Sequence, residues 1–269
     1  MRDSGNAGSD QRQYQVAPEP SADRTGQLRW GRFPAGMELR AGIQSRLKAF
    51  LPRYPGYYLL RPDELGDSLD FSASPIRHHI RVRQESGGNL QGDYTALPVE
   101  TDSVDLAVLL FTQDFSRHPR GLIKEISRCL IPHGHVILFG LNPWSLWGAT
   151  AAFRTKSAKV PWQGHFISPG RMQDWLELLG LESVHEERWL FLPPLRRESG
   201  IHGFNWLEYI GRRGWPQCGA VYMIVARKQV ATLTPIKPRW RQRKAMMPGV
   251  VAGPCSKVTA ERNRFEEDC

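Results

Sequence analysis

The sequence predicts an α/β fold with a doubly wound, mostly parallel sheet, and two apolar segments joined by a helix carry this prediction. Residues 104–112 are almost continuously apolar, which is typical of a strand covered by helices on both faces, whereas a half-solvated strand would alternate. Residues 135–141 form a second such segment. Between them, residues 122–130 place apolar side chains at helical spacing before Pro132-His133-Gly134 ends the helix. A strand-helix-strand unit of this length closes right-handed, with its strands parallel.

The flanking sequence supplies further elements of the same sheet. Ser168 and Pro169 provide an N-cap and a first-turn proline for a helix whose apolar face ends before Gly180. Four more strands are expected on either side of the central unit, at residues 56–60, 78–84, 182–192 and 220–227.

Polar residues lie at or beside the carboxyl ends of these strands. They are Asp93, Thr112-Gln113-Asp114 and Asn142-Pro143. Ligands of open α/β sheets bind outside the carboxyl ends of the strands. The sequence therefore predicts a ligand site at this edge.

The motif at the centre of the chain resembles a known family. It runs Gly-Asp-x-x-x-Leu-Pro-x-x-x-Asp-Ser-Val-Asp from Gly92 to Asp105, and continues through an apolar strand, a His118-Pro119 helix start and an Arg-Cys-Leu helix end to Pro-His-Gly and a closing strand. This order is similar to the middle of a class I S-adenosylmethionine-dependent methyltransferase, type 11 subgroup, which includes quinone-biosynthesis methyltransferases. The well-matched part covers roughly one fifth of the chain, and a looser match extends from Leu28 to Lys228.

The resemblance implies a Rossmann-like methyltransferase fold with seven strands, of which the final pair is antiparallel, and S-adenosylmethionine as cofactor. It implies that Asp93 accepts a hydrogen bond from the adenine amino group and that Tyr94 offers its backbone amide to the ring. Leu110 and Phe111 would line the cofactor beyond the strand. The alternative for Asp93 is a turn acid that caps its own backbone.

The sequence departs from the family after its first strand. The glycine-rich turn of these enzymes lets the backbone approach the methionyl group, but Arg61-Pro62-Asp63-Glu64-Leu65-Gly66-Asp67 contains no Gly-x-Gly. The acid expected at the end of the second strand, for the ribose, is represented by Glu85 or a neighbour.

Two hypotheses follow from this departure. The first is a methyltransferase acting on a small or apolar acceptor beside residues 142–153. The second is a catalytically weak, methyltransferase-like binding module that holds a partner through its aromatic edge or basic tail. Room for a methionyl group at residues 61–67 favours the enzyme, whereas Arg61 or Pro62 filling that space favours the module.

Residues 144–153 are apolar and aromatic, and they follow a strand end. They are expected either to wall the acceptor pocket or to form a short helix whose aromatic side chains cover the sheet. Arg154, Lys156 and Lys159 come next and suit either an anionic acceptor or solvent. A second polar and aromatic segment, residues 202–209, is expected near the same edge.

No catalytic base is identified. His118, His133, His135, His165 and His202 are candidates, but a structural role is the preferred interpretation for each. Methyl transfer can proceed largely by aligning the acceptor with the sulfonium of the cofactor, so the absence of an obvious base does not exclude the enzyme.

Composition predicts one domain with tails. In this chain of 269 residues with 41% hydrophobic content, residues 28–230 are expected to form the methyltransferase-like domain. Residues 1–27 are polar and are expected to be disordered. Because they lack the apolar core of a signal peptide, and no stretch of about 18 apolar residues exists to span a membrane, a cytoplasmic location is expected. Cys129, Cys218, Cys255 and Cys269 show no metal-ligand spacing.

Positive charge is concentrated at the end of the chain. Thirty-six Lys and Arg against 27 acids give a net charge of +9, and residues 231–269 contain Lys237, Arg239, Arg241, Arg243 and Lys244. This basic tail is expected to be disordered. It could contact nucleic acid or anionic lipid through phosphates, or be a solvated tail without a partner.

Overall fold

The computed structural model describes residues 28–84, 88–153, 161–193 and 213–229. This part of the chain forms a seven-stranded sheet with the order β3-β2-β1-β4-β5-β7-β6. The strands are β1 (Tyr58–Arg61), β2 (His78–Arg83), β3 (Leu90–Gln91), β4 (Val104–Leu110), β5 (Leu130–Leu141), β6 (Leu181–Trp189) and β7 (Val221–Lys228). The helices are α1 (Gly36–Phe50), α2 (Thr112–Phe115), α3 (Pro119–Cys129), α4 (Leu146–Phe153) and α5 (Pro169–Leu178).

The strand directions confirm the predicted fold class. The pairs β3–β2, β2–β1, β1–β4 and β4–β5 are parallel. Strand β7 is antiparallel to both of its neighbours, β5 and β6. The sheet is thus mostly parallel, and its final pair is antiparallel as the resemblance implied.

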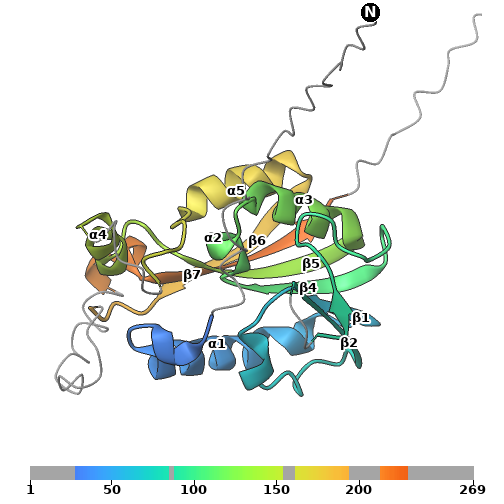
Figure 1. Cartoon of the computed structure of the whole chain (residues 1–269), viewed down its shortest axis with the longest axis horizontal. Coiled ribbons are helices and arrows are strands. Elements are labelled where there is room, and N and C mark those ends of the chain that lie inside the picture. The colour runs from blue at the N-terminus through green and yellow to red at the C-terminus, as the bar shows by residue number, and fades with distance from the viewer. Residues whose placement is uncertain (1–27, 85–87, 154–160, 194–212, 230–269) are drawn as a thin grey trace, which may run out of the picture. The chain divides into compact units, whose positions relative to one another are not determined.

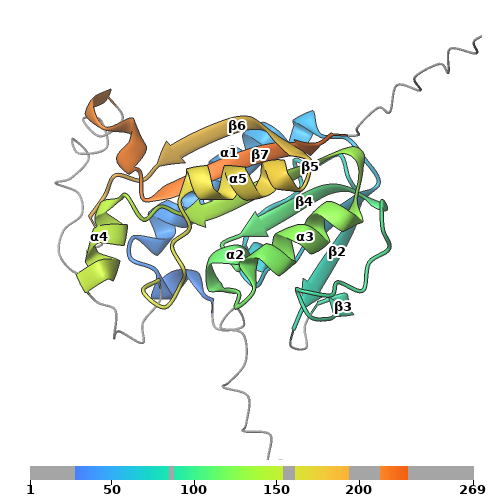
Figure 2. The same ribbon diagram turned by 90° about the horizontal axis from the view of Figure 1, so that it is seen from above.

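Helices cover both faces of the sheet. Helix α1 lies on one face, and α3 and α5 lie on the other (Figures 1 and 2). Strand β4 separates the two hydrophobic cores: Leu106, Val108 and Leu110 join the core beneath α1, whereas Ala107 and Leu109 join the core beneath α3 and α5. Burial of both faces explains why the sequence of this strand is continuously apolar.

The central elements differ from the predicted bounds in two places. Strand β4 ends at Leu110, because Phe111 adopts a left-handed backbone with φ of 62° and cannot continue the strand. Strand β5 begins at Leu130, before the predicted His135, because Leu130 pairs with Val104 ahead of an irregularity in the register.

The connection between β1 and β2 contains no α-helix. Residues 62–77 are all described, and their one regular element is the 3₁₀ turn Gly66–Ser68. In a doubly wound sheet a helix normally crosses between adjacent parallel strands. Helix α1, which precedes β1, packs Leu39, Ile43, Leu47 and Phe50 into the core on this face instead.

The predicted tails, residues 1–27 and 231–269, lie outside the described residues, as does the segment 202–209. Within the described part of the chain, no helix combines the length and the apolar character that crossing a membrane requires.

Candidate functional site at the carboxyl ends of the strands

The turn after β1 is closed by side chains of its own sequence. The carboxylate of Asp63 accepts a hydrogen bond from the backbone N–H of Gly66. The guanidinium of Arg61 lies over the ring of Phe71, 4.2 Å from its centroid, and donates to the carbonyl of Gly66 at 3.3 Å. Thr112, just beyond β4, donates from Oγ1 to the carbonyl of Pro62 at 2.7 Å. The turn is therefore fixed from inside and tied to the end of β4.

The buried charges in this turn perturb each other. Asp63 is 5% exposed, and burial raises its pKa from 3.8 to about 6, although Arg61 and the Gly66 amide partly oppose the shift. Burial lowers the pKa of Arg61, against the attraction of Asp63 and Asp67. A side chain at Gly66 would place its Cβ 2.5 Å from Asp63 Oδ1. This position therefore requires glycine, although the sequence lacks the Gly-x-Gly pattern.

Arg61 occupies the inner side of the turn, since only 7% of the residue is exposed. The segment before α1 packs beside it, where Trp30 donates from Nε1 to the carbonyl of Leu65 at 3.2 Å. Within the β1 turn, Arg61 thus fills the space that a methionyl group would need, which favours the binding-module hypothesis.

Acidic side chains of the β1 turn form ion pairs with arginines near the end of β2. Arg83 forms ion pairs with Glu64, at 3.4 Å, and with Asp67. Arg81 pairs with the same Asp67 at 3.3 Å. Glu85, the acid predicted for the ribose, lies outside the described residues.

Asp93 lies in a tight turn between β3 and β4. Its carboxylate accepts the backbone N–H of Thr95 at 2.9 Å, and its carbonyl accepts that of Ala96 at 3.1 Å. This is the turn-capping role that the sequence left open as an alternative. The residue is also exposed, so a turn acid and a cofactor ligand are compatible roles here. The side chain of Tyr94 is fully buried in the core beneath α3.

Leu110 and Phe111 are both fully buried. The ring of Phe111 lies 5.6 Å from that of Phe33, which in turn makes an edge contact with Phe115 at 6.2 Å. Residues just before α1 therefore cover the end of β4 on one face. The predicted cofactor roles of Leu110 and Phe111 remain predictions.

Two buried polar side chains of α2 connect the ends of β4 and β5. Asp114 accepts the backbone N–H of Leu141 at 3.0 Å, and Gln113 donates to the carbonyl of Phe139 at 2.7 Å. Burial raises the pKa of the Asp114 carboxyl well above its usual value. The backbone carbonyl of Asp114 also accepts the N–H of His165 at 2.5 Å. Asp114 thus holds β5 and the segment before α5 in place.

Asn142 fixes the start of the aromatic segment. Its Nδ2 donates to the carbonyls of Gln217 and Gly219, both at 2.8 Å, and its Oδ1 accepts the N–H of Trp144 at 3.0 Å. The expected short helix with a buried aromatic side chain is confirmed, whereas the acceptor-pocket role stays a prediction. Trp147 in α4 is fully buried and donates to the carbonyl of Leu192 at 2.9 Å, whereas Trp144 is 74% exposed.

A cavity of about 640 Å³ opens beside Trp144, and we call it the β5-end cavity. It lies between the segment after β5, the start of α3, and the N-terminal half of α5. Among the residues that the structure describes, none in the lining is acidic. The charged and aromatic side chains in the lining are Arg117, Trp144, His165, Phe166, Arg171 and Trp175.

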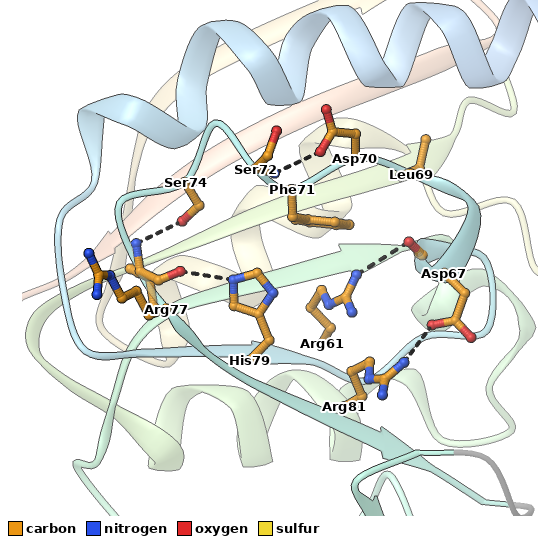
Figure 3. Close-up of a pocket in the computed structure, with 12 residues that line it drawn as sticks. Arg61, Asp67, Leu69, Asp70, Phe71, Ser72, Ser74, Arg77, His79 and Arg81 are labelled. Atoms are coloured by element: carbon orange, nitrogen blue, oxygen red, sulfur yellow. Dashed lines mark hydrogen bonds and ion pairs between the residues drawn. The ribbon is translucent and has the colours of Figure 1, made fainter.

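A second cavity, of about 670 Å³, is lined by residues 66–77 of the loop without a helix and by side chains of β1 and β2 (Figure 3). Its lining mixes charges, because it contains Arg61, Arg77 and Arg81 together with Asp67 and Asp70. Arg81 is already bound, to Asp67 and to the Asn89 side chain at 2.9 Å. His79 contacts the carbonyl of Ile76 at 2.9 Å.

The candidate histidines lie in different environments. His165 is exposed and lines the β5-end cavity. His118 is the residue before α3, and His133 adopts φ of 64° in the turn within β5. Burial lowers the pKa of His135, whose ring lies 4.5 Å from that of Tyr54. His202 lies outside the described residues.

The described residues contain no group of three or more His, Cys, Asp or Glu side chains that could hold a metal ion. Two cysteines fall in this part of the chain, Cys129 and Cys218, and both are free thiols.

The strand order, the antiparallel β7 and the polar residues at the carboxyl ends define the class as that of methyltransferase-like α/β proteins. Residues 68–138 match the family described as Methyltransferase domain. This match and the sheet order support the resemblance to the class I S-adenosylmethionine-dependent methyltransferases that the sequence motif indicated. The match begins after the β1 turn, at which the sequence departs from the family pattern.

The chain is also similar to a bacterial protein along most of its length and, in its fold, to solved structures. The chain is 29% identical over 221 residues to a protein of Escherichia coli K12 named as uncharacterized protein YafS, a match that covers 79% of this chain and 88% of that one. A possible histamine N-methyltransferase of Thermotoga maritima has a TM-score of 0.51 at 18% identity, over 74% of this chain and 91% of its own. A putative methyltransferase of Haloferax volcanii, solved with the Trm112 activator, has a TM-score of 0.52 at 16% identity, over 78% and 98%. At these identities the two structures show the fold.

Some site residues were not singled out from the sequence. Asp63 was seen only as part of a turn without glycines, and Arg171 and Trp175 only as parts of a helix. The sequence signal for Asp63 was its spacing to Gly66, because an Asp three residues before a glycine can cap that glycine's N–H.

Proposed function

We propose that this protein is an S-adenosylmethionine-dependent methyltransferase whose cofactor binds at the carboxyl ends of β1, β3 and β4. The observation that carries the proposal is the coincidence of two independent features. The complete seven-strand order with its antiparallel β7 agrees with the family match over residues 68–138, and that match contains Asp93, Tyr94, Leu110 and Phe111.

The residues present fit the adenine half of the cofactor. Asp93 is exposed, and its bond to the Thr95 amide holds the carboxylate in one orientation, so it would accept from the adenine amino group. The methyl group would come from the sulfonium of the bound cofactor. At the methionyl half, the buried Arg61 fills the inner side of the β1 turn, and no residue is assigned to the cofactor carboxylate.

The acceptor would be a small molecule bound beside residues 142–153. The exposed Trp144 and the adjoining β5-end cavity support this position, since both lie directly after β5. No general base is assigned, because alignment of the acceptor with the sulfonium can supply much of the acceleration.

A second candidate function is a catalytically weak binding module with the same fold. The specific observation that favours it is the β1 turn, where Arg61 fills the inner side and no α-helix follows before β2. A shared fold does not fix the activity. In that case the aromatic edge or the basic tail would hold a partner.

Thermal unfolding in the presence of S-adenosylmethionine, or of its demethylated product, distinguishes the two functions. A ligand that binds only the folded state stabilises it by about 2.7 kcal/mol at 100 times its Kd, so the enzyme should show a rising Tm with cofactor concentration. A Tm that stays flat up to millimolar cofactor would support the binding module.

A further inference from the structure

The charge of the β5-end cavity points to an anionic ligand. Each charged side chain in the lining is an arginine, Arg117 or Arg171, and the one other titratable side chain there is His165. Arginine presents a planar fork of donors that matches a carboxylate or a phosphate. A cavity whose lining holds these cations and no acid selects against cationic ligands.

The aromatic side chains of the same cavity point to a flat ligand. Trp144 is 74% exposed although its backbone is held by Asn142, so an anchored backbone presents a large ring to solvent. Phe166 is backed by Trp162 in a stacked pair with an interplanar angle of 5°. The guanidinium groups of Arg120 and Arg171 lie 4.9 Å and 5.8 Å from the ring centroid of Trp175, so Arg171 packs against an aromatic wall of the cavity. An exposed ring such as that of Trp144 can stack on an aromatic ligand.

The walls of the cavity are fixed before any ligand binds. The backbone at His165 is held by the carbonyl of the buried Asp114, whose carboxylate is in turn bound to β5 at Leu141. The first turn of α5, which carries Arg171, is capped by Ser168 at 3.4 Å. A preorganised site loses less conformational entropy on binding, and a volume of about 640 Å³ is in the range of small-molecule sites.

From the lining, charge and rigidity together, we infer that the β5-end cavity binds a planar aromatic anion. That this ligand is the methyl acceptor rests on the proposed function and on the position of the cavity directly after β5. That the cavity binds such a ligand rests on its own residues.

The test uses the full-length protein and calorimetric titration with four probes of matched size. Naphthalene-2-carboxylate carries both required features, naphthalene-2-carboxamide lacks the charge, decahydronaphthalene-2-carboxylate lacks the aromatic rings, and 2-naphthylmethylamine reverses the charge. We expect the first to bind about tenfold or more tightly than each of the others, since a charge-assisted hydrogen bond or a stacked ring contributes at least that factor.

Variants locate the binding within the cavity. Arg171→Gln and Trp144→Ala should each weaken naphthalene-2-carboxylate about tenfold. Both side chains are exposed, so folding should be preserved. The matched controls are Lys124→Gln, which removes an exposed positive charge of α3 outside the lining, and Trp215→Ala, which removes a tryptophan that is 73% exposed elsewhere. Both controls should bind like the wild type.

Three results would overturn the inference: no binding of naphthalene-2-carboxylate at millimolar concentration, equal binding of the carboxamide, or unchanged binding in both cavity variants. A parallel titration with S-adenosylmethionine separates this inference from the proposed function. If naphthalene-2-carboxylate binds and the cofactor does not, the methyltransferase proposal is wrong and the cavity inference stands. If the cofactor binds and naphthalene-2-carboxylate does not, the cavity inference is wrong and the methyltransferase proposal stands.

Discussion

Asp63 shows how one residue can replace a sequence motif. The family holds the turn after the first strand with glycines, whereas this chain closes it with a buried carboxylate on the Gly66 amide and with the Arg61 guanidinium against Phe71. Burial disfavours the charged form of this carboxyl group and raises its pKa to about 6. Asp63 therefore makes the stability of the β1 turn dependent on pH.

The first prediction concerns Asp63→Asn. With the pKa raised from 3.8 to about 6, the folded state keeps a proton that the unfolded state has lost between these pH values. The contribution of Asp63 to the free energy of unfolding is thus fully present below pH 4 and is lost as pH rises through 6, by about 3 kcal/mol as an upper value. Asparagine does not titrate, so the variant should gain stability relative to the wild type from pH 4 to pH 7.

Urea unfolding at several pH values between 4 and 7 measures this change. Asp174→Asn, at an exposed carboxylate of α5, is the control and should follow the wild-type pH dependence. If Asp63→Asn also follows the wild type, the Asp63 carboxyl titrates normally and the account of the turn is wrong.

The second prediction concerns Asp93→Ala and cofactor affinity. A carboxylate hydrogen bond to an adenine amino group contributes on the order of 1.5 to 3 kcal/mol, so the Kd of S-adenosylmethionine should rise about 10- to 100-fold. Asp93→Asn keeps an acceptor for the Thr95 amide and removes only the charge. Comparison of the two variants therefore distinguishes the effect of the charge from the effect of a disrupted turn. Unchanged affinity in a folded Asp93→Ala variant would remove Asp93 from the site.

Among the elements, β5 and β7 depend on close contact between a glycine and an aromatic ring. Tyr222 on β7 lies opposite Gly140 on β5, and a Cβ at Gly140 would meet the ring and hydroxyl of Tyr222 at 2.3 Å. The ring is fully buried, so it cannot move away easily.

The third prediction is that Gly140→Ala destabilises the protein by about 1 to 3 kcal/mol through overpacking. Gly170→Ala in α5 is the matched control, because no atom lies within 4 Å of the position that its new methyl group would take and alanine is the better helix former. Thermal and urea unfolding should separate the two variants clearly. Equal stability of Gly140→Ala and the wild type would mean that β5 and β7 are less tightly packed than described.

The elements also show how far the sequence could predict the fold. The apolar runs identified β4 and the second half of β5, because both faces of these strands are buried, and the Ser168 cap located the start of α5. Helix α1 was not predicted, although Leu39, Ile43 and Leu47 recur at helical spacing. The missing helix between β1 and β2 could not be foreseen either, since the absence of a glycine motif does not say what replaces it.

Prediction of the site was limited in the same way. The polar residues at the strand ends were recognised, because parallel topology brings the carboxyl ends to one edge. The β5-end cavity was not, because its arginines and aromatic residues come from three segments, residues 117–119, 143–144 and 165–175. Only the folded chain brings them together. Trp144 and Trp147 have opposite environments three residues apart, which composition alone does not distinguish.

For the whole molecule, the fourth prediction concerns the basic tail. The sheet is complete at Lys228, so deletion of every residue after Val230 should leave the Tm nearly unchanged. Binding to polyanions should fall, because each Lys or Arg that pairs with a phosphate releases counterions and makes binding strongly salt-dependent. Heparin affinity chromatography and thermal unfolding of the two lengths measure both effects. A Tm lowered by many degrees would place residues 231–269 within the folded domain.

The proposed function requires that this fold, with its unusual β1 turn, binds S-adenosylmethionine. Isothermal titration of the full-length protein with S-adenosylmethionine measures this binding. We expect one binding site per chain, weakened in Asp93→Ala and retained in the control Asp174→Ala. The absence of binding heat at millimolar cofactor, at two temperatures and with the protein folded, would contradict it and would leave the binding module as the function of this fold.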